Sequence, residues 1–224
     1  MSAREAILSK VRRALAAGGD DVERLTSVTQ RLAGAPRGVV PARAQLDHEA
    51  RIALFCTMAR SAAASVVRVS NEADVPNAVS TYLRSKNLAA KVRMGADKRL
   101  RQMPWVNERQ LQVRNGPSDG GDEVAVSHAA AGIAETGTLA LWSGKDNPTT
   151  LNFLPEHHIV VLEAKDIVGD LESVVAAVRG RFGKGEMPRT LNFITGPSRS
   201  GDIEQTLLLG AHGPRALHIV VVGG

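Results

Sequence analysis

The stretch that decides the fold runs from residue 157 to residue 182 and reads "HHIVVLEAKDIVGDLESVVAAVRGRF". Its first part, residues 157–164, is a nearly continuous apolar run rich in Val and Ile, which predicts a strand buried on both faces. The second part, residues 166–182, predicts a helix. A buried strand followed by a helix is the repeating unit of an α/β domain.

The same alternation extends to both sides of this stretch. Further strands are predicted at residues 65–69, 89–94, 111–114, 122–129, 137–143, 189–196 and 216–224. Helices are predicted at residues 46–63 and 72–87, and a turn around "AGIAE", residues 131–135, is expected to join two of the strands. Short Val- and Ile-rich runs separated by helices predict a three-layer α/β/α fold around a mostly parallel sheet, with some mixed pairing in the second half.

The amino-terminal part of the chain reads differently. Residues 3–17 predict an amphipathic helix that stops at Gly18-Gly19. Its apolar side chains recur at helical spacing: Ile7, Leu8, Val11 and Leu15. The prolines and glycines of "GAPRGVVPARA", residues 34–44, indicate a linker. We therefore divide the chain into a helical arm with its linker, residues 1–44, and an α/β domain, residues 45–224. The arm is expected to pack on the body or on a second subunit of a homo-oligomer.

The charges are distributed unevenly over the 224 residues, whose net charge is +5. Residues 51–114 hold 12 Lys and Arg against 4 Asp and Glu, a local excess of +8 that would steer an anionic ligand or an acidic partner. The alternative is that these cations are scattered, solvated positions. Aromatic residues make up only 3% of the chain, and the sequence holds no helix-turn-helix, zinc finger or compact basic block. Nucleic acid is therefore not the expected ligand.

Cysteine and histidine usage limits the chemistry. Cys56 is the only cysteine, so the chain forms no internal disulfide and cannot hold an iron–sulfur cluster through cysteines of its own. His157 and His158 alternate in a predicted strand, so their side chains point to opposite faces, and no metal site is expected. The charged amino terminus is unlike a signal peptide, and no apolar run reaches the ~18 residues of a membrane span. A cytoplasmic protein without a membrane span is the expectation.

One polar segment, "GPSRSGDIE" at residues 196–204, directly follows a predicted strand. In open α/β sheets, ligands bind outside the carboxyl ends of the strands. Gly196 lets backbone N–H groups approach a bound group closely, and Ser198 and Ser200 offer hydroxyl donors. The guanidinium of Arg199 suits a carboxylate or a phosphate. These features indicate an anion site.

The continuation of this segment allows two interpretations. If residues 202–209 begin a helical turn, Ser200 or Asp202 would cap it and its free amides would add to the anion site. However, the Asp202 and Glu204 carboxylates would compete with an anion for those donors. The alternative is a structural loop in which Arg199 pairs with a carboxylate.

A second candidate is "ETGT", residues 135–138, between two apolar runs. A carboxylate such as Glu135, partly buried beside a glycine at a sheet edge, can serve as a base or a nucleophile. The alternative is a tight connection in which Gly137 takes a positive φ and Thr136 and Thr138 are ordinary strand residues.

Taken together, three segments of the sequence resemble the lactate utilization protein C family, whose members share the LUD domain. They are "GIAETGTLAL" at residues 132–141, "LPEHHIVVLEAKDIV" at 154–168 and "ITGPSRSGDIEQTLLLGAHGPRALHIVVV" at 194–222. The resemblance covers about residues 45–222. It implies the fold of ribose-5-phosphate isomerase, glucosamine-6-phosphate deaminase and coenzyme A transferases, termed NagB/RpiA/CoA transferase-like. It also implies a role in oxidising L-lactate to pyruvate beside companion proteins, at least one with iron–sulfur clusters.

The resemblance carries candidate residues onto this chain. Glu135 is the candidate catalytic residue, by analogy of fold with the glutamate nucleophile of coenzyme A transferases. The candidate ligand-binding residues are Thr136, Gly137, Thr138, Gly196, Pro197, Ser198, Arg199, Ser200, Asp202, Glu204 and His212. Where a common form of the family loop has Thr-Ala, this chain has Ser200-Gly201, which keeps the hydroxyl.

Three functions remain open from the sequence. The first is a component without redox centres or cofactors of its own, which binds a small anionic ligand or the iron–sulfur partner proteins of a lactate oxidation system. The second is a free-standing isomerase or CoA-transferase-like enzyme that acts on a phosphorylated or carboxylate substrate, with Glu135 as base or nucleophile. The third is a regulator or scaffold that uses the basic segment and the helical arm.

Overall fold

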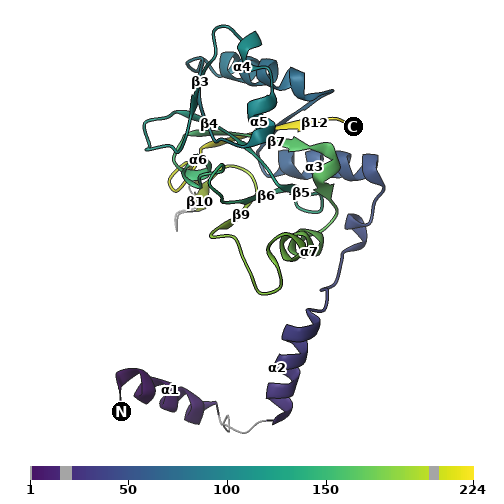
Figure 1. The fold of residues 1–224 in the computed structure, drawn as a ribbon, viewed down its shortest axis with the longest axis vertical. Helices are drawn as coiled ribbons and strands as arrows, with labels where there is room; N and C mark the ends of the chain where they lie inside the picture. Colours follow the sequence, from purple (N-terminus) through teal and green to yellow (C-terminus); the bar gives the residue numbers. More distant parts are fainter. Residues whose placement is uncertain (1, 16–21, 202–206) are drawn as a thin grey trace. The chain divides into compact units, whose positions relative to one another are not determined.

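The protein is described by a computed structural model that covers residues 2–15, 22–201 and 207–224 (Figure 1). It forms two units, residues 1–39 and residues 40–224. The first unit holds α1 (Ala3–Ala14) and α2 (Val22–Gly34). Ser2 caps α1, because its hydroxyl accepts from the Glu5 N–H while the Glu5 carboxylate accepts from the Ser2 N–H. The sequence analysis predicted α1 but not α2, and the expected Gly18-Gly19 stop lies outside the described residues.

The second unit is built on a parallel sheet of six described strands. In spatial order they are β1 (Ser65–Val69), β12 (Ala216–Val222), β7 (His157–Glu163), β4 (Val124–His128), β2 (Lys91–Met94) and β3 (Gln112–Asn115). Every adjacent pair in this order runs parallel. The helices of this unit are α3 (His48–Ser61), α4 (Val75–Ser85), α5 (Lys98–Gln102), α6 (Thr150–Phe153) and α7 (Leu171–Phe182). Short 3-10 turns occupy Ala42–Ala44, Glu72–Asp74, Trp105–Asn107 and Ala164–Asp166.

The sheet is covered on both faces. The odd-numbered positions of β7, Ile159 and Val161, pack with side chains of α4 and α5. The even-numbered positions, Val160 and Leu162, pack with α3 and a second, smaller sheet. Burial of each large apolar side chain contributes ~1.5–3 kcal/mol relative to exposure, so β7 is held from both sides. The predicted three-layer α/β/α fold is confirmed (Figure 1).

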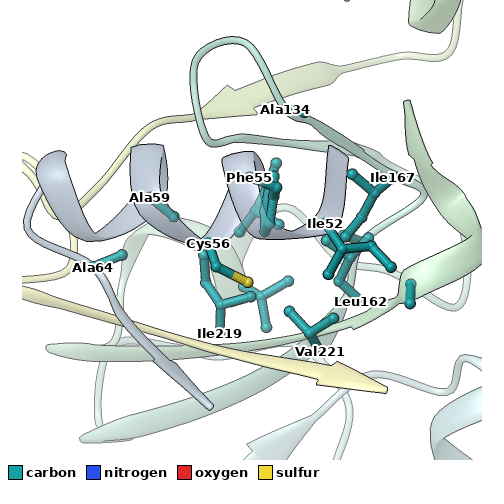
Figure 2. Packing of buried hydrophobic residues seen from close by; sticks show 14 of the residues in the cluster. Ile52, Phe55, Cys56, Ala59, Ala64, Ala134, Leu162, Ile167, Ile219 and Val221 are labelled. Atoms are coloured by element: carbon teal, nitrogen blue, oxygen red, sulfur yellow. The ribbon is translucent and has the colours of Figure 1, made fainter. Parts of the chain in front are cut away.

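Helix α3 packs in one core cluster with side chains of both the main sheet and the smaller sheet. Asp47 caps its first turn by accepting from the Ala50 N–H at 2.9 Å. Its buried side chains include Ile52, Phe55 and Cys56. Figure 2 shows Cys56 next to Ile219 of the main sheet, whereas Phe55 lies close to Gly132 of the smaller sheet. Cys56 is a free, buried thiol, and burial raises its pKa. Its place in the core is that of a small apolar residue.

The smaller sheet accounts for the mixed pairing that the sequence predicted. Its described strands are β8 (Ile167–Val168), β5 (Ala131–Ile133), β6 (Thr138–Trp142) and β9 (Leu191–Ile194). The pairs β5–β6 and β6–β9 are antiparallel, whereas β5–β8 is parallel. The sequence did not separate these strands from the main sheet, because short apolar runs do not show which sheet they join.

Two predicted boundaries in this region were wrong. The expected turn around residues 131–135 is in its first part the strand β5, where Gly132 lies so close to Leu162 that a Cβ would approach that side chain to 2.7 Å. The helix expected from residue 166 begins only at Leu171, because Ile167 and Val168 form β8. Asp170 is the N-cap of that helix and accepts from the Ser173 N–H at 2.8 Å.

The segment after β9 forms a hairpin. β10 (Arg199–Gly201) pairs with β11 (Leu207–Leu209) in antiparallel register. Of the segment 202–209, which the sequence allowed to begin a helical turn, the last three residues form a strand, and residues 202–206 lie outside the described part of the chain. None of the described helices is long and apolar enough to cross a membrane.

Candidate functional site

Gly137 of "ETGT" and Gly196 of "GPSRSGDIE" both pack against the C-terminal end of α3. Gly137 has φ +66°, and a Cβ there would lie 2.2 Å from the Ala59 backbone nitrogen. Gly196 has φ +75°, and a Cβ there would lie 2.0 Å from the Ala62 carbonyl oxygen. Both contacts are with backbone, which cannot move aside as a flexible side chain can. The sequence "ETGT" and the loop after β9 therefore need glycine to pack against the same helix end.

A chain of hydroxyl groups joins the two motifs. Thr138 Oγ1 lies 2.6 Å from Thr195 Oγ1, the residue before Gly196. Thr136 Oγ1 lies 2.7 Å from Thr138 Oγ1. Since β6 and β9 are neighbours in the smaller sheet, this contact follows from their pairing. The structure thus brings the two motifs together at one end of that sheet.

The loop after β9 walls a cavity of about 220 Å³. The lining residues are Asn152, Phe153, His158, Phe193, Ile194, Thr195, Gly196, Pro197, Ser198, His212, Gly213, Pro214 and Leu217. The loop is fixed to the "HGP" segment, residues 212–214, because the Ser198 N–H donates to the Pro214 carbonyl at 2.8 Å. Four of the predicted ligand-binding residues therefore line one cavity: Gly196, Pro197, Ser198 and His212.

His158 and Asn152 are buried polar residues of this cavity. The Nε2 atom of His158 lies 3.0 Å from Ser127 Oγ, and the Ser127 hydroxyl donates to Asn152 Oδ1 at 3.3 Å. The other ring nitrogen, Nδ1, is buried without a hydrogen-bond partner. Burial lowers the pKa of His158 to about 3, so the ring is neutral at neutral pH. His157 points to the opposite face, as predicted, where its Nδ1 lies 2.9 Å from Tyr82 Oη.

Glu135 lies elsewhere. Its carboxylate accepts from the Leu171 N–H, the first amide of α7, at 3.3 Å, and only 9% of the residue is exposed. A carboxylate at a helix N-terminus is stabilised by the free amides and the helix dipole. In this structure Glu135 therefore joins the "ETGT" turn to α7, and it is not among the residues that line the cavity.

Arg199 and its neighbours also lie outside the cavity lining. The Arg199 guanidinium donates to the Ala62 carbonyl at 3.3 Å, at the C-terminus of α3, where a cation is favourable. Ser200 pairs with Leu208 in the hairpin. Asp202 and Glu204 belong to the residues that the structure does not describe.

The cavity lies at the opposite edge of the main sheet from the one expected. His158 and Leu217 are the second residues of β7 and β12, so the cavity opens at the amino ends of these parallel strands. The loop does follow the carboxyl end of β9, but β9 belongs to the smaller sheet. The sequence analysis missed His158, Asn152 and Phe193, and the only signal for His158 was a polar residue at an inward position of a buried strand.

The carboxyl edge of the main sheet holds a different group of polar residues. His128 and Glu163 end the adjacent strands β4 and β7, with His128 Nε2 3.7 Å from Glu163 Oε1 and neither atom hydrogen-bonded. His128 Nδ1 donates to the Ala129 carbonyl at 2.7 Å. Burial, followed by the charge of Arg99, lowers the pKa of His128 to about 4, and burial raises the pKa of Glu163.

Three or more His, Cys, Asp or Glu side chains that could together hold a metal ion are not found among residues 2–15, 22–201 and 207–224. The cavity residues offer instead two imidazole rings, hydroxyl groups and an apolar wall. This combination suits a small organic molecule with one polar and one apolar end.

The fold defines the class of protein. A crystal structure of a DUF162 family protein from Deinococcus radiodurans superimposes with a TM-score of 0.59 at 25% sequence identity, over 80% of this chain and 99% of that chain. The LUD domain family matches residues 52–222. The chain belongs to the LUD domain family.

Curated relatives agree with this assignment. Lactate utilization protein C of Geobacillus sp. (strain WCH70) is 39% identical over 100 residues, which is 44% of this chain and 42% of the relative. Lactate utilization protein C of Shouchella clausii (strain KSM-K16) is 34% identical over 100 residues, 44% of each chain. The matched stretches thus span less than half the length of these relatives.

Proposed function

We propose that this chain is a cytoplasmic, ligand-binding subunit of an L-lactate utilization system, in which iron–sulfur partner proteins oxidise L-lactate to pyruvate. The observation that carries the proposal is the cavity that unites the "GPS" and "HGP" segments around His158. The names of the curated relatives supply the lactate context. The buried Cys56 thiol, with its raised pKa, supports a subunit that leaves the redox centres to its partners.

The ligand in this proposal is a small organic anion. Ser198 and His212 supply donors for a carboxylate, while the apolar wall formed by Phe193, Ile194 and Leu217 accommodates a short hydrocarbon group. The cavity of about 220 Å³ is below the usual ~300–1,000 Å³ of drug-sized sites, which favours a ligand of only a few heavy atoms.

An apolar rim next to the cavity supports the proposed partner contact. Phe153, Leu154, Phe193 and Leu209 are 42%, 48%, 44% and 59% exposed. A neighbouring hollow of about 500 Å³ shares Phe153, His212 and Gly213 with the cavity and includes Leu154 and Leu209. A cluster of exposed apolar side chains beside a ligand cavity is typical of a surface that a partner covers. In this position the partner also closes the cavity.

Growth and binding experiments test this proposal together. The gene is deleted in the source organism, and the strain is complemented with the wild type, Ser198→Tyr or Ser200→Tyr. Ser198→Tyr fills the cavity, whereas Ser200 lies in the hairpin outside the cavity lining and serves as the matched control. We expect growth on L-lactate to be lost with Ser198→Tyr alone. Normal growth of the deletion strain on L-lactate, or no co-purification with iron–sulfur proteins, would contradict the proposal.

A second function is favoured by the pair at the carboxyl edge. His128 and Glu163, with perturbed pKa values at the ends of adjacent parallel strands, have the arrangement of an acid–base pair. They support a free-standing isomerase or CoA-transferase-like enzyme acting on a phosphorylated or carboxylate substrate. Turnover by the isolated chain of a sugar phosphate or an acyl-coenzyme A ester, lost in Glu163→Gln, would establish it. Loss in Glu135→Gln instead would restore Glu135 as the catalytic residue.

A further inference from the structure

The two outer strands of the main sheet differ in composition. Among the described strands, β1 and β3 stand at the ends of the spatial order, so each has one edge that no described strand covers. β3 reads "QVRN" and is mostly polar, whereas β1 reads "SVVRV" and carries valines on both faces. The valines of β1, Val66, Val67 and Val69, are only half-buried. A valine-rich strand with an open edge is a template for pairing with a further strand.

The backbone of β1 has polar groups that face this open edge. The Val69 carbonyl accepts from the Gly223 N–H at 2.9 Å, so the backbone groups of Val69 face β12. Successive residues of a strand direct their N–H and C=O groups to opposite edges, so those of Val66 and Arg68 face away from β12. In agreement, the Val66 carbonyl accepts from the exposed guanidinium of Arg60 at 3.3 Å. The edge therefore offers the backbone groups of Val66 and Arg68 to a partner strand.

A groove of about 630 Å³ lies beside this edge, between β1 and α4. Asp74 and Lys86 flank the two ends of α4, and both line the groove, which therefore extends along the whole helix. Tyr82 and His218 form part of its wall, with their ring centroids stacked 4.2 Å apart. The groove shares no lining residue with the cavity around His158, so this surface is distinct from the proposed ligand site.

The charges around the edge are separated along β1. Because α3 and α4 both run opposite to β1, their C-terminal cations, Arg60 and Lys86, lie by the start of β1. The carboxylates at their N-terminal ends, Glu49 and Asp74, lie by the end of β1, where Glu49 Oε2 is 3.6 Å from Arg68 Nη2. A second copy of this edge, turned end to end, would set each cationic end against an acidic end. The edge is thus complementary to itself under a twofold rotation, as a symmetric dimer requires.

From these features we propose that two copies of this chain pair antiparallel through β1, which joins their main sheets into one continuous sheet. Val66 of one copy pairs with Arg68 of the second copy through their open N–H and C=O groups, and the two Val67 residues meet on the twofold axis. Lys86 lies by Asp74 of the second copy. This dimer goes beyond the proposed function and does not depend on it, because the ligand cavity takes no part in the pairing.

The backbone pairing is tested by analytical ultracentrifugation of the full chain. Arg68→Pro removes the outward N–H and leaves the ladder with β12 intact, whereas Arg68→Ala, the matched control, removes the same charge but keeps the N–H. We expect dimers of the wild type and of Arg68→Ala. Arg68→Pro should raise the dimer dissociation constant about tenfold or more relative to Arg68→Ala, because one hydrogen bond is lost on each side of the axis. Circular dichroism and thermal unfolding establish that each variant is folded.

A charge exchange tests the antiparallel orientation, and it also serves if Arg68→Pro does not fold. Lys86→Asp and Asp74→Lys each bring like charges together across the axis, so each should raise the dissociation constant about threefold or more. The double variant restores opposite charges and should return the constant to near that of the wild type. Failure of the double variant to recover would overturn the orientation.

A cross-link tests the register. Facing residues whose backbone groups point away from each other lie ~4.5 Å apart between Cα atoms in antiparallel strands, a separation that a disulfide spans. Val67→Cys should therefore cross-link two copies under mild oxidation, whereas Val113→Cys in the other outer strand, β3, should not. A monomeric wild type would overturn the proposal. A dimer that persists unchanged in Arg68→Pro and does not cross-link through Val67→Cys would also overturn it, because another surface would then hold the copies together.

Discussion

Replacement of Gly196 by alanine tests how the ligand loop is held. A Cβ at this position would lie 2.0 Å from the Ala62 carbonyl oxygen, and the residue has φ +75°. Gly185 provides a matched control, because it has φ +83° but nothing within 4 Å of the site of a Cβ. The gain from a less flexible unfolded chain is the same for both replacements and cancels in the comparison.

The two variants should differ by the cost of the backbone contact. Gly185→Ala should lower the free energy of unfolding by ~1 kcal/mol, the cost of a side chain in the left-handed region. Gly196→Ala should lower it by ~3 kcal/mol, because overpacking against backbone adds about 1–3 kcal/mol. Urea denaturation followed by circular dichroism measures both values. If Gly196→Ala were no more destabilising than Gly185→Ala, the close packing of the loop on α3 would be refuted.

Three further predictions concern the buried histidines, Glu135 and the apolar rim. Burial lowers the pKa of His128, His158 and His218 to about 4, 3 and 4, so below pH 6.5 the unfolded chain binds more protons than the folded one. The free energy of unfolding should therefore fall as the pH drops from 6.5 toward 4.5, by up to ~1.4 kcal/mol per pH unit for each ring. Urea denaturation midpoints measured over this pH range should fall less steeply in His158→Leu than in the wild type. Glu135→Gln should weaken only the contact with the Leu171 N–H, which should lower the free energy of unfolding by ~1 kcal/mol in urea denaturation. The affinity for L-lactate should not change. Loss of L-lactate binding in a folded Glu135→Gln variant would refute the purely structural role of Glu135. Leu154→Glu together with Leu209→Glu should abolish co-purification with iron–sulfur partners while the isolated chain keeps its ligand affinity, and retained co-purification would exclude the rim as the contact.

Strands β1, β4, β7 and β12 of the main sheet could be predicted because they carry apolar residues on both faces. β7 is the clearest case, since Ile159 and Val160 pack in different core clusters. Short elements were harder to predict. Ile167 and Val168 fit a helix or a strand equally well, and their pairing with Gly132 and Ile133 depends on residues more than thirty positions away.

The site was predictable in part for a similar reason. Glycine and proline in "GPS" and "HGP" mark loops, and these loops do line the cavity. The hydrogen bonds around His158 depend on Ser127 and Asn152, which belong to other segments, so no local pattern could reveal them. The charge and shape of Arg199 suggested anion binding, whereas in the structure its guanidinium contacts the carbonyl end of α3. Local chemistry shows what a side chain can do, but the fold determines which partner it meets.

The most direct test of the account is the location of bound L-lactate. Backbone amide shifts of the full chain are mapped while L-lactate is added. The account predicts that the largest changes occur at Thr195, Gly196, Ser198 and Gly213, at the amino edge of the main sheet. Changes centred instead on Gly95, Ala129 and Ala164, at the carboxyl edge beside His128 and Glu163, would contradict it.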